Sequence, residues 1–168
     1  MVGVAGGSEK CAYAVQTLGF DACVDHRDAA LRERLAAECP QGIDVYFENV
    51  GGAVLAAVLP LLNAHARVPV CGLIAHYNDT EATAPKWAAT MMRAVLTKRL
   101  NLRGFIVSDF AARRPEFLRD MSAWVREGKV KYKEFVTEGL DSAPAAFMGL
   151  LKGANFGKQL VRIGPDKA

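Results

Sequence analysis

Two glycines and a lysine near the N-terminus are the clearest indication of a binding site in the sequence. Gly6 and Gly7 follow a short apolar run, and Lys10 comes about one helical turn later. In sites that bind NAD, an acidic residue at the end of such a strand accepts hydrogen bonds from the ribose 2′-hydroxyl group. Glycines at this place leave room for a 2′-phosphate, and a lysine near the positive end of a helix dipole would pair with it. The spacing therefore favours NADP(H), and the alternative is an ordinary surface lysine.

Polar and glycine-rich segments follow two other apolar runs. Asn49 comes just before Gly51 and Gly52, and residues 71–77 follow the next apolar run. In open α/β sheets, ligands bind outside the carboxyl ends of the strands. The Asn49 amide could reach a ribose hydroxyl group, and the glycines would let a ribose or nicotinamide lie against the backbone. Both segments are also good material for plain turns, so a ligand site and simple loops remain equal alternatives.

Other polar residues give no basis for choosing a catalytic residue. His26 and His65 lack a carboxylate and a serine at an interpretable spacing, so we expect both at the surface. Asp44, Glu48 and Asp109 are not visibly paired for acid–base catalysis. The short motifs of serine hydrolases, zinc proteases and P-loop proteins do not occur in the sequence.

The composition is that of a globular protein and disfavours several function classes. Of the 168 residues, 51% are hydrophobic and 23% are charged, and the formal net charge is +3. The basic residues are scattered, which favours a solvated surface over a nucleic-acid interface. Neither an apolar run of roughly 18 residues nor a signal peptide is visible, so we expect a cytoplasmic protein without a membrane partner. The four cysteines lack the spacing of a zinc site or a disulfide framework, which predicts reduced thiols and no bound metal.

The elements that must position these residues alternate between strands and helices. Apolar runs of strand length occupy residues 1–5, 22–24, 43–47, 66–72, 102–107, 133–138 and 158–163. Helical periodicity is found at residues 9–18, 31–36, 54–62, 86–100, 114–128 and 143–152, with a polar loop at 76–85. Pro60 should bend or shorten the third of these helices. This alternation predicts an α/β fold with a doubly wound parallel sheet.

The opening strand and helix are typical of the second βα unit of a dinucleotide-binding fold. The first unit of such a fold normally carries the glycine-rich turn that cradles the pyrophosphate. We therefore expect an incomplete Rossmann-type sheet that lacks the first βα unit. Because the absent strand is normally central, its loss would leave unpaired backbone groups. We expect either direct pairing of the two flanking strands or association with another chain.

Motifs along almost the whole chain carry a resemblance to a known family. They are V-A-G-G-S-E-K at residues 4–10, G-I-D-V-Y-F-E-N-V-G-G at 42–52, V-C-G-L-I at 70–74, G-F-I-V at 104–107 and A-P-A-A-F-M-G-L-L-K-G-A-N-F-G-K at 143–158. The N-V-G-G segment and the last motif are more specific than general Rossmann signals. The chain resembles the C-terminal half of zinc-independent medium-chain dehydrogenases/reductases, in particular the leukotriene B4 12-hydroxydehydrogenase/prostaglandin reductase-like group, which includes alkenal/one and curcumin reductases.

The resemblance implies an NADPH-dependent enzyme that reduces the carbon–carbon double bond of a small enone or enal without a metal. Lys10 would bind the 2′-phosphate, together with His26, which stands where relatives often have tyrosine. Asn155 would contact the cofactor from the C-terminal tail. The residues that would hold the ribose, pyrophosphate and nicotinamide are Asn49, the loop residues Cys71, Gly72, Leu73, Ile74, Ala75, His76 and Tyr77, and the backbone of Phe105, Ile106 and Val107.

The resemblance also predicts the domain organisation. Residues 1–130 would form a partial NADP-binding domain, and residues 131–168 a strand–helix–strand tail that normally packs on a catalytic domain. The intact protein would be a homodimer or a higher oligomer. The chain alone should be a poor enzyme, because the pyrophosphate turn and most of the substrate pocket lie outside it. The alternative is a non-catalytic module for nucleotide binding or oligomerisation; a methyltransferase is disfavoured, since it would need an acidic residue in place of Gly6 and Gly7.

Overall fold

The computed structural model describes residues 1–80 and 87–165. Within these residues the strands are β1 (Val2–Ala5), β2 (Ala22–Asp25), β3 (Ile43–Val45), β4 (Leu62–Val70), β5 (Asn101–Gly104), β6 (Glu134–Glu138) and β7 (Lys158–Arg162). The α-helices are α1 (Ser8–Gln16), α2 (Leu31–Glu38), α3 (Gly52–Val58), α4 (Ala88–Lys98), α5 (Arg114–Arg126) and α6 (Ala143–Leu151). Short 3-10 helices are η1 (Leu59–Leu61), η2 (Ile74–His76), η3 (Val107–Arg113) and η4 (Leu140–Ser142). The last part of the predicted loop 76–85 and the first residue of the predicted helix 86–100 lie outside the described residues.

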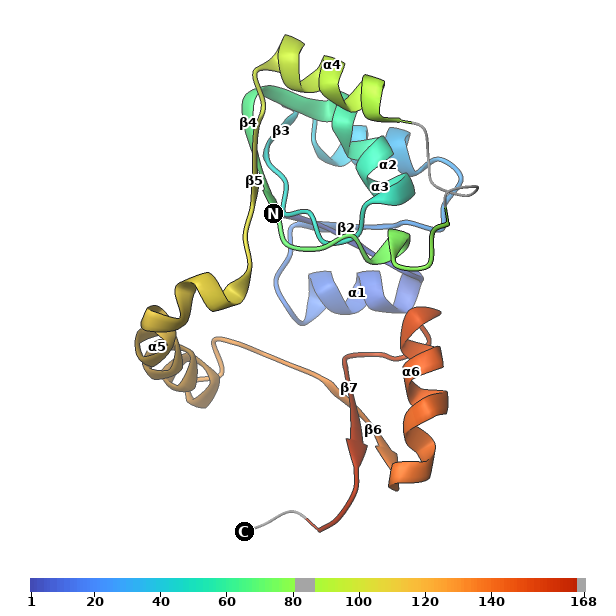
Figure 1. The fold of residues 1–168 in the computed structure, drawn as a ribbon, viewed down its shortest axis with the longest axis vertical. Coiled ribbons are helices and arrows are strands. Elements are labelled where there is room, and N and C mark those ends of the chain that lie inside the picture. The colour runs from blue at the N-terminus through green and yellow to red at the C-terminus, as the bar shows by residue number, and fades with distance from the viewer. Residues whose placement is uncertain (81–86, 166–168) are drawn as a thin grey trace.

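The first two strands form a parallel pair with helices on both sides. The register runs from Val2 opposite Ala22 to Ala5 opposite Asp25, so both strands end at the same level. Gly7 precedes α1 with a φ of +95°, in the left-handed region that favours glycine. In Figure 1, α1 lies on one side of β2, whereas α2 and α3 lie on the other. This arrangement confirms the predicted doubly wound α/β fold.

The next three strands form a second parallel sheet in the order β3, β4, β5. β3 is short, but the chain continues alongside β4, since the N–H groups of Tyr46 and Glu48 donate to the carbonyl oxygens of Arg67 and Pro69. Glu48 also forms a bridge with Val70, the last residue of β4. The segments that follow β3 and β4 are thereby brought to the same edge of the sheet.

The boundary between α3 and β4 differs from the sequence prediction. The predicted helix 54–62 ends at Val58, one 3-10 turn follows, and β4 begins at Leu62 rather than at residue 66. Pro60 has no N–H group to continue the helical ladder, so it shortens the helix as expected. Lys98 of α4 fixes the turn, because its Nζ donates to the carbonyl oxygens of Leu59 (3.3 Å), Pro60 (2.8 Å) and Leu62 (2.6 Å).

One hydrophobic core underlies both sheets. It joins β2 and α2 to α3, η1 and β4, and Leu100 adds to it from the end of α4. Residues at alternate positions of β1, Val2 and Val4, pack against its edge. The buried members of this core are Val24, Leu31, Leu35, Val54, Ala57, Val58, Leu59, Leu62, Ala66, Val68 and Leu100.

The two sheets are nevertheless separate. β1 pairs with β2 and β3 pairs with β4, but β1 and β3 do not pair with each other. Of the two expected alternatives, direct pairing of the flanking strands is therefore wrong, and association with another chain stays a prediction. α2 and α3 contact each other, and packed helices lie about 8–10 Å apart, whereas paired strands are only about 4.8 Å apart. The two sheets are thus joined through the packing of α2 against α3 and not through a strand ladder.

The C-terminal part forms a third unit, in which β6 and β7 pair in parallel beside α6. It contacts α1 through an aromatic cluster: the rings of Tyr13 and Phe156 are 5.2 Å apart, and the Lys133 ammonium lies 3.6 Å from the Phe156 ring centre. Lys10 of α1 also donates to the Gly153 carbonyl oxygen at 2.8 Å. These contacts attach the C-terminal unit to the face of the first sheet that α1 covers (Figure 1).

Candidate cofactor site

The loops after β3 and β4 are joined by backbone hydrogen bonds. The N–H group of Cys71 donates to the Glu48 carbonyl oxygen at 2.8 Å, and the N–H group of Ala75 donates to the Val50 carbonyl oxygen at 2.9 Å. The N–H group of Ile74 donates to the Asn49 carbonyl oxygen at 3.4 Å. The structure therefore brings together Asn49 and the predicted loop residues 71–77 at the carboxyl ends of the strands.

A buried carboxylate shapes the first of these loops. Glu48 is 1% exposed, and its Oε1 accepts hydrogen bonds from the N–H groups of Val50 (2.6 Å) and Gly51 (2.7 Å). Its Oε2 is buried and has no hydrogen-bond partner among the described residues. Burial raises the pKa of the Tyr46 phenol, and the neighbouring Glu48 carboxylate raises it further. Glu48 thus holds the turn that presents Asn49.

His76 connects the second loop to the start of α3. Its Nε2 lies 2.9 Å from the Gly52 nitrogen and accepts that N–H group, so this ring nitrogen carries no proton. The proton is on Nδ1, which is 2.6 Å from the Asp79 carboxylate and donates to it. This tautomer follows from the hydrogen bonds. His76 therefore links the second loop to the start of α3. The expectation of a surface position concerned only His26 and His65.

Glycines let the two loops approach closely. A Cβ atom on Gly72 would lie 2.6 Å from Oδ1 of Asn49 and 3.4 Å from the Tyr77 hydroxyl group. A Cβ atom on Gly51 would lie 2.6 Å from Cδ2 of His76. Side chains at these positions would collide with the polar groups of the opposite loop, which explains the glycines that the sequence places there.

The predicted residues after β5 lie beside these loops. The Phe105 N–H group donates to the carbonyl oxygen of Val70 at 3.3 Å, and its ring is 6.2 Å from that of Phe47. Ile106 and Val107 follow with side chains that are 67% and 81% exposed. The segment 105–107 therefore extends the same edge of the sheet and presents apolar side chains to the surface.

A second group of predicted residues lies at the carboxyl ends of β1 and β2. Oδ1 of Asp25 accepts the N–H groups of Gly7 (2.9 Å) and Arg27 (3.0 Å), which fixes the two turns relative to each other. His26 is exposed, and a Cβ atom on Gly6 would lie 2.8 Å from its Nε2. Lys10 reaches the Gly153 carbonyl oxygen. Lys10 and His26 thus belong to the same end of this sheet.

Asn155 is near this second group, but its side chain is engaged locally. Its Nδ2 donates to the Gly157 carbonyl oxygen at 2.7 Å, within the turn that leads to β7. The same turn includes Gly153, which accepts from Lys10.

Sequence reasoning missed Asp25, Arg27 and the structural role of Glu48. Asp25 accepts the N–H group two residues further along, which is the pattern of an Asx-turn, and this local signal could have identified it. Glu48 also accepts the N–H group two residues further along, but the sequence does not show that its carboxylate is buried. No sequence signal marks the Arg27 side chain, because its position depends on contacts with distant segments.

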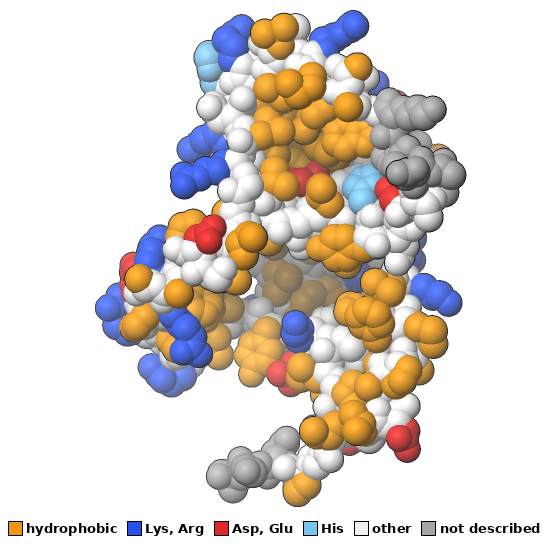
Figure 2. Space-filling view, in the orientation of Figure 1, with side chains coloured by type: hydrophobic (Ala, Val, Ile, Leu, Met, Phe, Trp, Pro, Cys, Tyr) orange, Lys and Arg blue, Asp and Glu red, His pale blue; other side chains and the backbone are white. Residues whose placement is uncertain are grey.

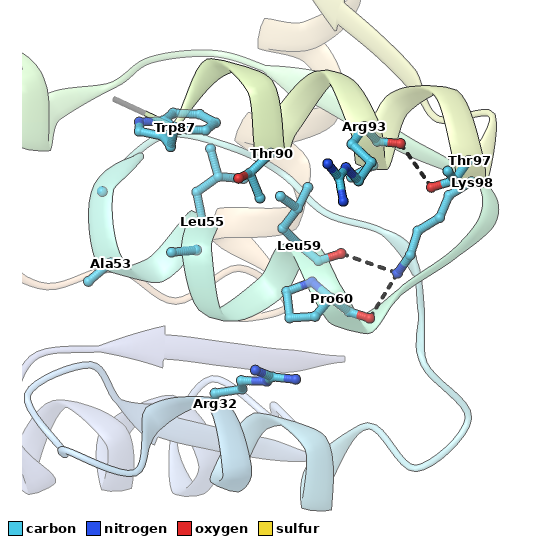
Figure 3. A pocket seen from close by; sticks show the side chains of 13 residues that line it. Arg32, Ala53, Leu55, Leu59, Pro60, Trp87, Thr90, Arg93, Thr97 and Lys98 are labelled. Atoms are coloured by element: carbon cyan, nitrogen blue, oxygen red, sulfur yellow. Dashed lines mark hydrogen bonds between the residues drawn. The ribbon is translucent and has the colours of Figure 1, made fainter. Parts of the chain in front are cut away.

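Two apolar cavities have few residues in common with these two groups. One, of about 710 Å³, lies between α3 and α4; Figure 3 shows Leu55, Leu59 and Trp87 along it, with Arg32 and Arg93 among the residues that line it. The other, of about 810 Å³, is lined by residues of η3 and α5. Of the predicted cofactor residues, only Val107 lines either cavity. The polar groups that could bind a cofactor therefore lie at the strand ends rather than in these cavities.

The sequence pattern of the zinc-binding dehydrogenase family matches residues 1–125. The chain belongs to this family. Its amino-acid sequence is 53% identical over 168 residues to the NADPH-dependent curcumin reductase of Escherichia coli, covering 99% of this chain and 49% of that protein. It is 39% identical over 164 residues to prostaglandin reductase 1 of Rattus norvegicus, covering 96% of this chain and 49% of that protein. The chain thus spans about half the length of these curated relatives.

The comparison with solved structures agrees with the comparison of sequences. CurA from Vibrio vulnificus, solved in complex with NADPH, matches with a TM-score of 0.91 and 48% identity, over 98% of this chain and 50% of that one. An NAD-dependent alcohol dehydrogenase matches at 20% identity with a TM-score of 0.72, which supports the fold alone. The predicted Rossmann-type fold and the resemblance to curcumin and prostaglandin reductases are confirmed.

The zinc in the family's description has no fitting ligand set among the residues that the structure describes. Among the described residues, no group of three or more His, Cys, Asp and Glu side chains is placed to hold a metal ion. Cys11, Cys23, Cys39 and Cys71 are all free. We therefore assign no zinc ligand. No helix in residues 1–80 and 87–165 is both long and apolar enough to span a membrane.

Proposed function

We propose that this chain is the NADP(H)-binding part of a reductase for the carbon–carbon double bond of enones and enals. The observation that carries the proposal is the convergence of turns rich in glycine at strand ends, in a chain 53% identical to an NADPH-dependent curcumin reductase. When bound, NADPH supplies the hydride. The residues of this chain bind the cofactor, orient it and exclude water from one side of it.

The site residues follow the two groups found in the structure. Lys10 and His26 bind the 2′-phosphate, because no carboxylate follows β1, His26 lies against Gly6, and Lys10 stands in the first turn of the helix that begins after Gly7. Asn49 and Tyr77 present an amide and a hydroxyl group at the joined loops, where they bind the ribose and the nicotinamide side. The backbone of Phe105, which follows β5, lies beside the same loops.

The remaining loop residues supply backbone and apolar contact. Asn155 approaches the cofactor from the tail if its bond to Gly157 is exchanged for one to the ligand. The loop residues in this role are Cys71, Gly72, Leu73, Ile74, Ala75 and His76, followed beyond β5 by Ile106 and Val107.

Three broader expectations belong to the same proposal. Residues 1–130 form the partial cofactor domain and residues 131–168 the tail, which pairs as its own two-stranded sheet. The protein is cytoplasmic, in agreement with four free cysteines. It is a homodimer or a larger assembly; every residue of β5 is exposed, so an outer strand is open to a second copy. Light scattering tests the assembly, and a monomer at all concentrations would contradict it.

A chimeric enzyme tests the catalytic part of the proposal. Residues 1–168 replace the matching half of the Escherichia coli relative, and consumption of NADPH is followed by nicotinamide absorbance with and without an α,β-unsaturated ketone. We expect ketone-dependent oxidation of NADPH. A chimera that folds and binds NADPH but never oxidises it would instead favour the alternative, a non-catalytic nucleotide-binding or oligomerisation module.

A further inference from the structure

We propose that Arg27 is a second cation for the 2′-phosphate of NADPH, held above the Gly6–Gly7 turn together with Lys10. The inference rests on the proposed cofactor function and adds to it a residue that determines the choice between NADPH and NADH. It follows from the position of the Arg27 guanidinium, from its lack of partners and from its convergence with Lys10.

The guanidinium covers the glycine turn closely. A Cβ atom on Gly6 would lie 3.3 Å from one terminal nitrogen of Arg27 and 3.4 Å from its Nε. A Cβ atom on Gly7 would lie 3.5 Å from the other terminal nitrogen. All three guanidinium nitrogens therefore lie at the turn that takes the place of the acidic residue of an NAD site.

The backbone on both sides of this contact is fixed. Oδ1 of Asp25 accepts the N–H groups of Gly7 and Arg27 together, so the glycine turn and the start of the Arg27 side chain share one anchor. The hydrogen bonds from the N–H groups of Gly7 and Arg27, with a smaller effect of the Arg27 charge, lower the pKa of Asp25. Because Oδ1 of this carboxylate is occupied by backbone donors, it binds the turn rather than the guanidinium.

Arg27 is exposed, and within residues 1–80 and 87–165 its guanidinium makes no hydrogen bond or ion pair. By contrast, Arg34 on the neighbouring helix is paired with Asp28 at 2.5 Å. A guanidinium presents several donors in a planar fork that matches two phosphate oxygens. The donors of Arg27 are thus available to a ligand.

Lys10 and Arg27 approach the same point from different segments. The Lys10 ammonium is 2.8 Å from the Gly153 carbonyl oxygen, and a terminal nitrogen of Arg27 would be 3.9 Å from a Cβ atom on Gly153. Lys10 comes from α1, Arg27 follows β2, and Gly153 lies in the tail. Lys10 keeps donors beyond the one used for Gly153. Two cations with free donors therefore approach each other at Gly153, and the Arg27 guanidinium extends from there to the glycine turn.

Substitution of Arg27 tests this assignment with probes that differ in the 2′-phosphate. Binding of 2′,5′-ADP, 5′-AMP, NADPH and NADH is measured by calorimetry for the wild-type chain and for Arg27→Ala, Arg27→Lys and Arg32→Ala. Arg32 is a matched control, since it lies on α2 and lines the cavity between α3 and α4. We expect Arg27→Ala to weaken 2′,5′-ADP and NADPH about tenfold and to leave 5′-AMP and NADH unchanged. Arg27→Lys should recover part of the loss, and Arg32→Ala should have no effect.

The outcomes separate this inference from the function on which it rests. If the wild-type chain prefers 2′,5′-ADP to 5′-AMP and Arg27→Ala keeps that preference, the role of Arg27 is overturned while the NADP(H) site stands. An equal loss for all four ligands would indicate a structural role and would also overturn it. A wild-type chain that does not distinguish 2′,5′-ADP from 5′-AMP would overturn both.

Discussion

Asp25 and Glu48 perform the same task at the ends of two strands. Each carboxylate accepts two backbone N–H groups, Asp25 from Gly7 and Arg27 and Glu48 from Val50 and Gly51. Both turns carry residues of the proposed site. Carboxylates that accept backbone donors form strong, charge-assisted hydrogen bonds. These two residues thus hold the turns that carry the proposed binding groups.

The role of Asp25 predicts a dependence of stability on pH. Backbone hydrogen bonds from Gly7 and Arg27 lower its pKa in the folded chain below the ordinary value of 3.8. The carboxylate therefore stabilises the folded state above about pH 4, and this stabilisation is lost as the pH falls through the lowered pKa. We expect Asp25→Asn to reduce the acid-induced loss of stability in urea unfolding at several pH values. Glu33→Gln, on the exposed face of α2, is the control, and equal acid slopes in all three proteins would contradict the prediction.

The reactivity of the cysteines reports on the loop after β4. Cys71 is exposed, whereas burial, aided by Cys11, raises the pKa of Cys23 to about 12. Because the thiolate is the reactive form, iodoacetamide should modify Cys71 before Cys23, as followed by mass spectrometry. NADPH should slow the modification of Cys71 and not that of Cys39, which follows α2. If NADPH slowed the modification of neither cysteine, or of both, the proposed contact between the cofactor and the loop after β4 would be contradicted.

At the residue scale, the sequence shows which residues stand at the site better than it shows which groups those residues contact. The glycine pair, Lys10 and Asn49 stand out because of their spacing along the chain. Arg27 and Glu48 do not, because their meaning depends on contacts: Arg27 lies against Gly6, some twenty residues earlier, and Glu48 is a buried carboxylate whose backbone donors are visible only in the folded turn.

At the scale of elements, the two loops act as one platform. His76 accepts from Gly52, and backbone bonds link Cys71 to Glu48 and Ala75 to Val50. A ligand that binds one loop therefore meets the other in a fixed position. Such preorganisation lowers the conformational cost of binding.

Gly72 is the position at which we expect a substitution to disturb the two joined loops most. In Gly72→Ala the new methyl group would lie 2.6 Å from Oδ1 of Asn49 and would turn that side chain away. The amide end is movable, so we expect a loss of unfolding free energy below about 1 kcal/mol but a roughly tenfold loss of NADPH affinity. Calorimetry and urea unfolding measure the two effects. Gly104→Ala is the control, since a Cβ atom there would have no neighbour within 4 Å.

The alternation of elements was predictable, whereas several boundaries were not. Runs of strand length predict every strand of the described residues, because strands are short and bounded by turns, but the predicted strands 43–47 and 102–107 end earlier, at Val45 and Gly104. The start of β4 is misplaced because Leu59, Leu61 and Leu62 fit either a helix or a strand. Lys98 decides between them, by binding carbonyl oxygens that the end of the helix leaves free, and that contact spans almost forty residues.

At the scale of the whole molecule, the chain offers surfaces that it does not cover itself. β1 and β3 each have one edge without a partner strand among the described residues. On β3 and just after it, Val45 and Phe47 are 52% and 58% exposed. Figure 2 shows further hydrophobic side chains gathered over several parts of one face. These edges and side chains support the proposal that the chain works in association with further protein, and that it alone is a poor enzyme.

The central claim is that the turns at the strand ends form an NADP(H) site, and the ratio of affinities for NADPH and NADH tests it most directly. Calorimetric titration of the 168-residue chain with each cofactor gives that ratio. Lys10 at the glycine turn predicts that NADPH binds at least about tenfold more tightly than NADH. Equal affinity for the two cofactors, or binding of neither, would contradict the account.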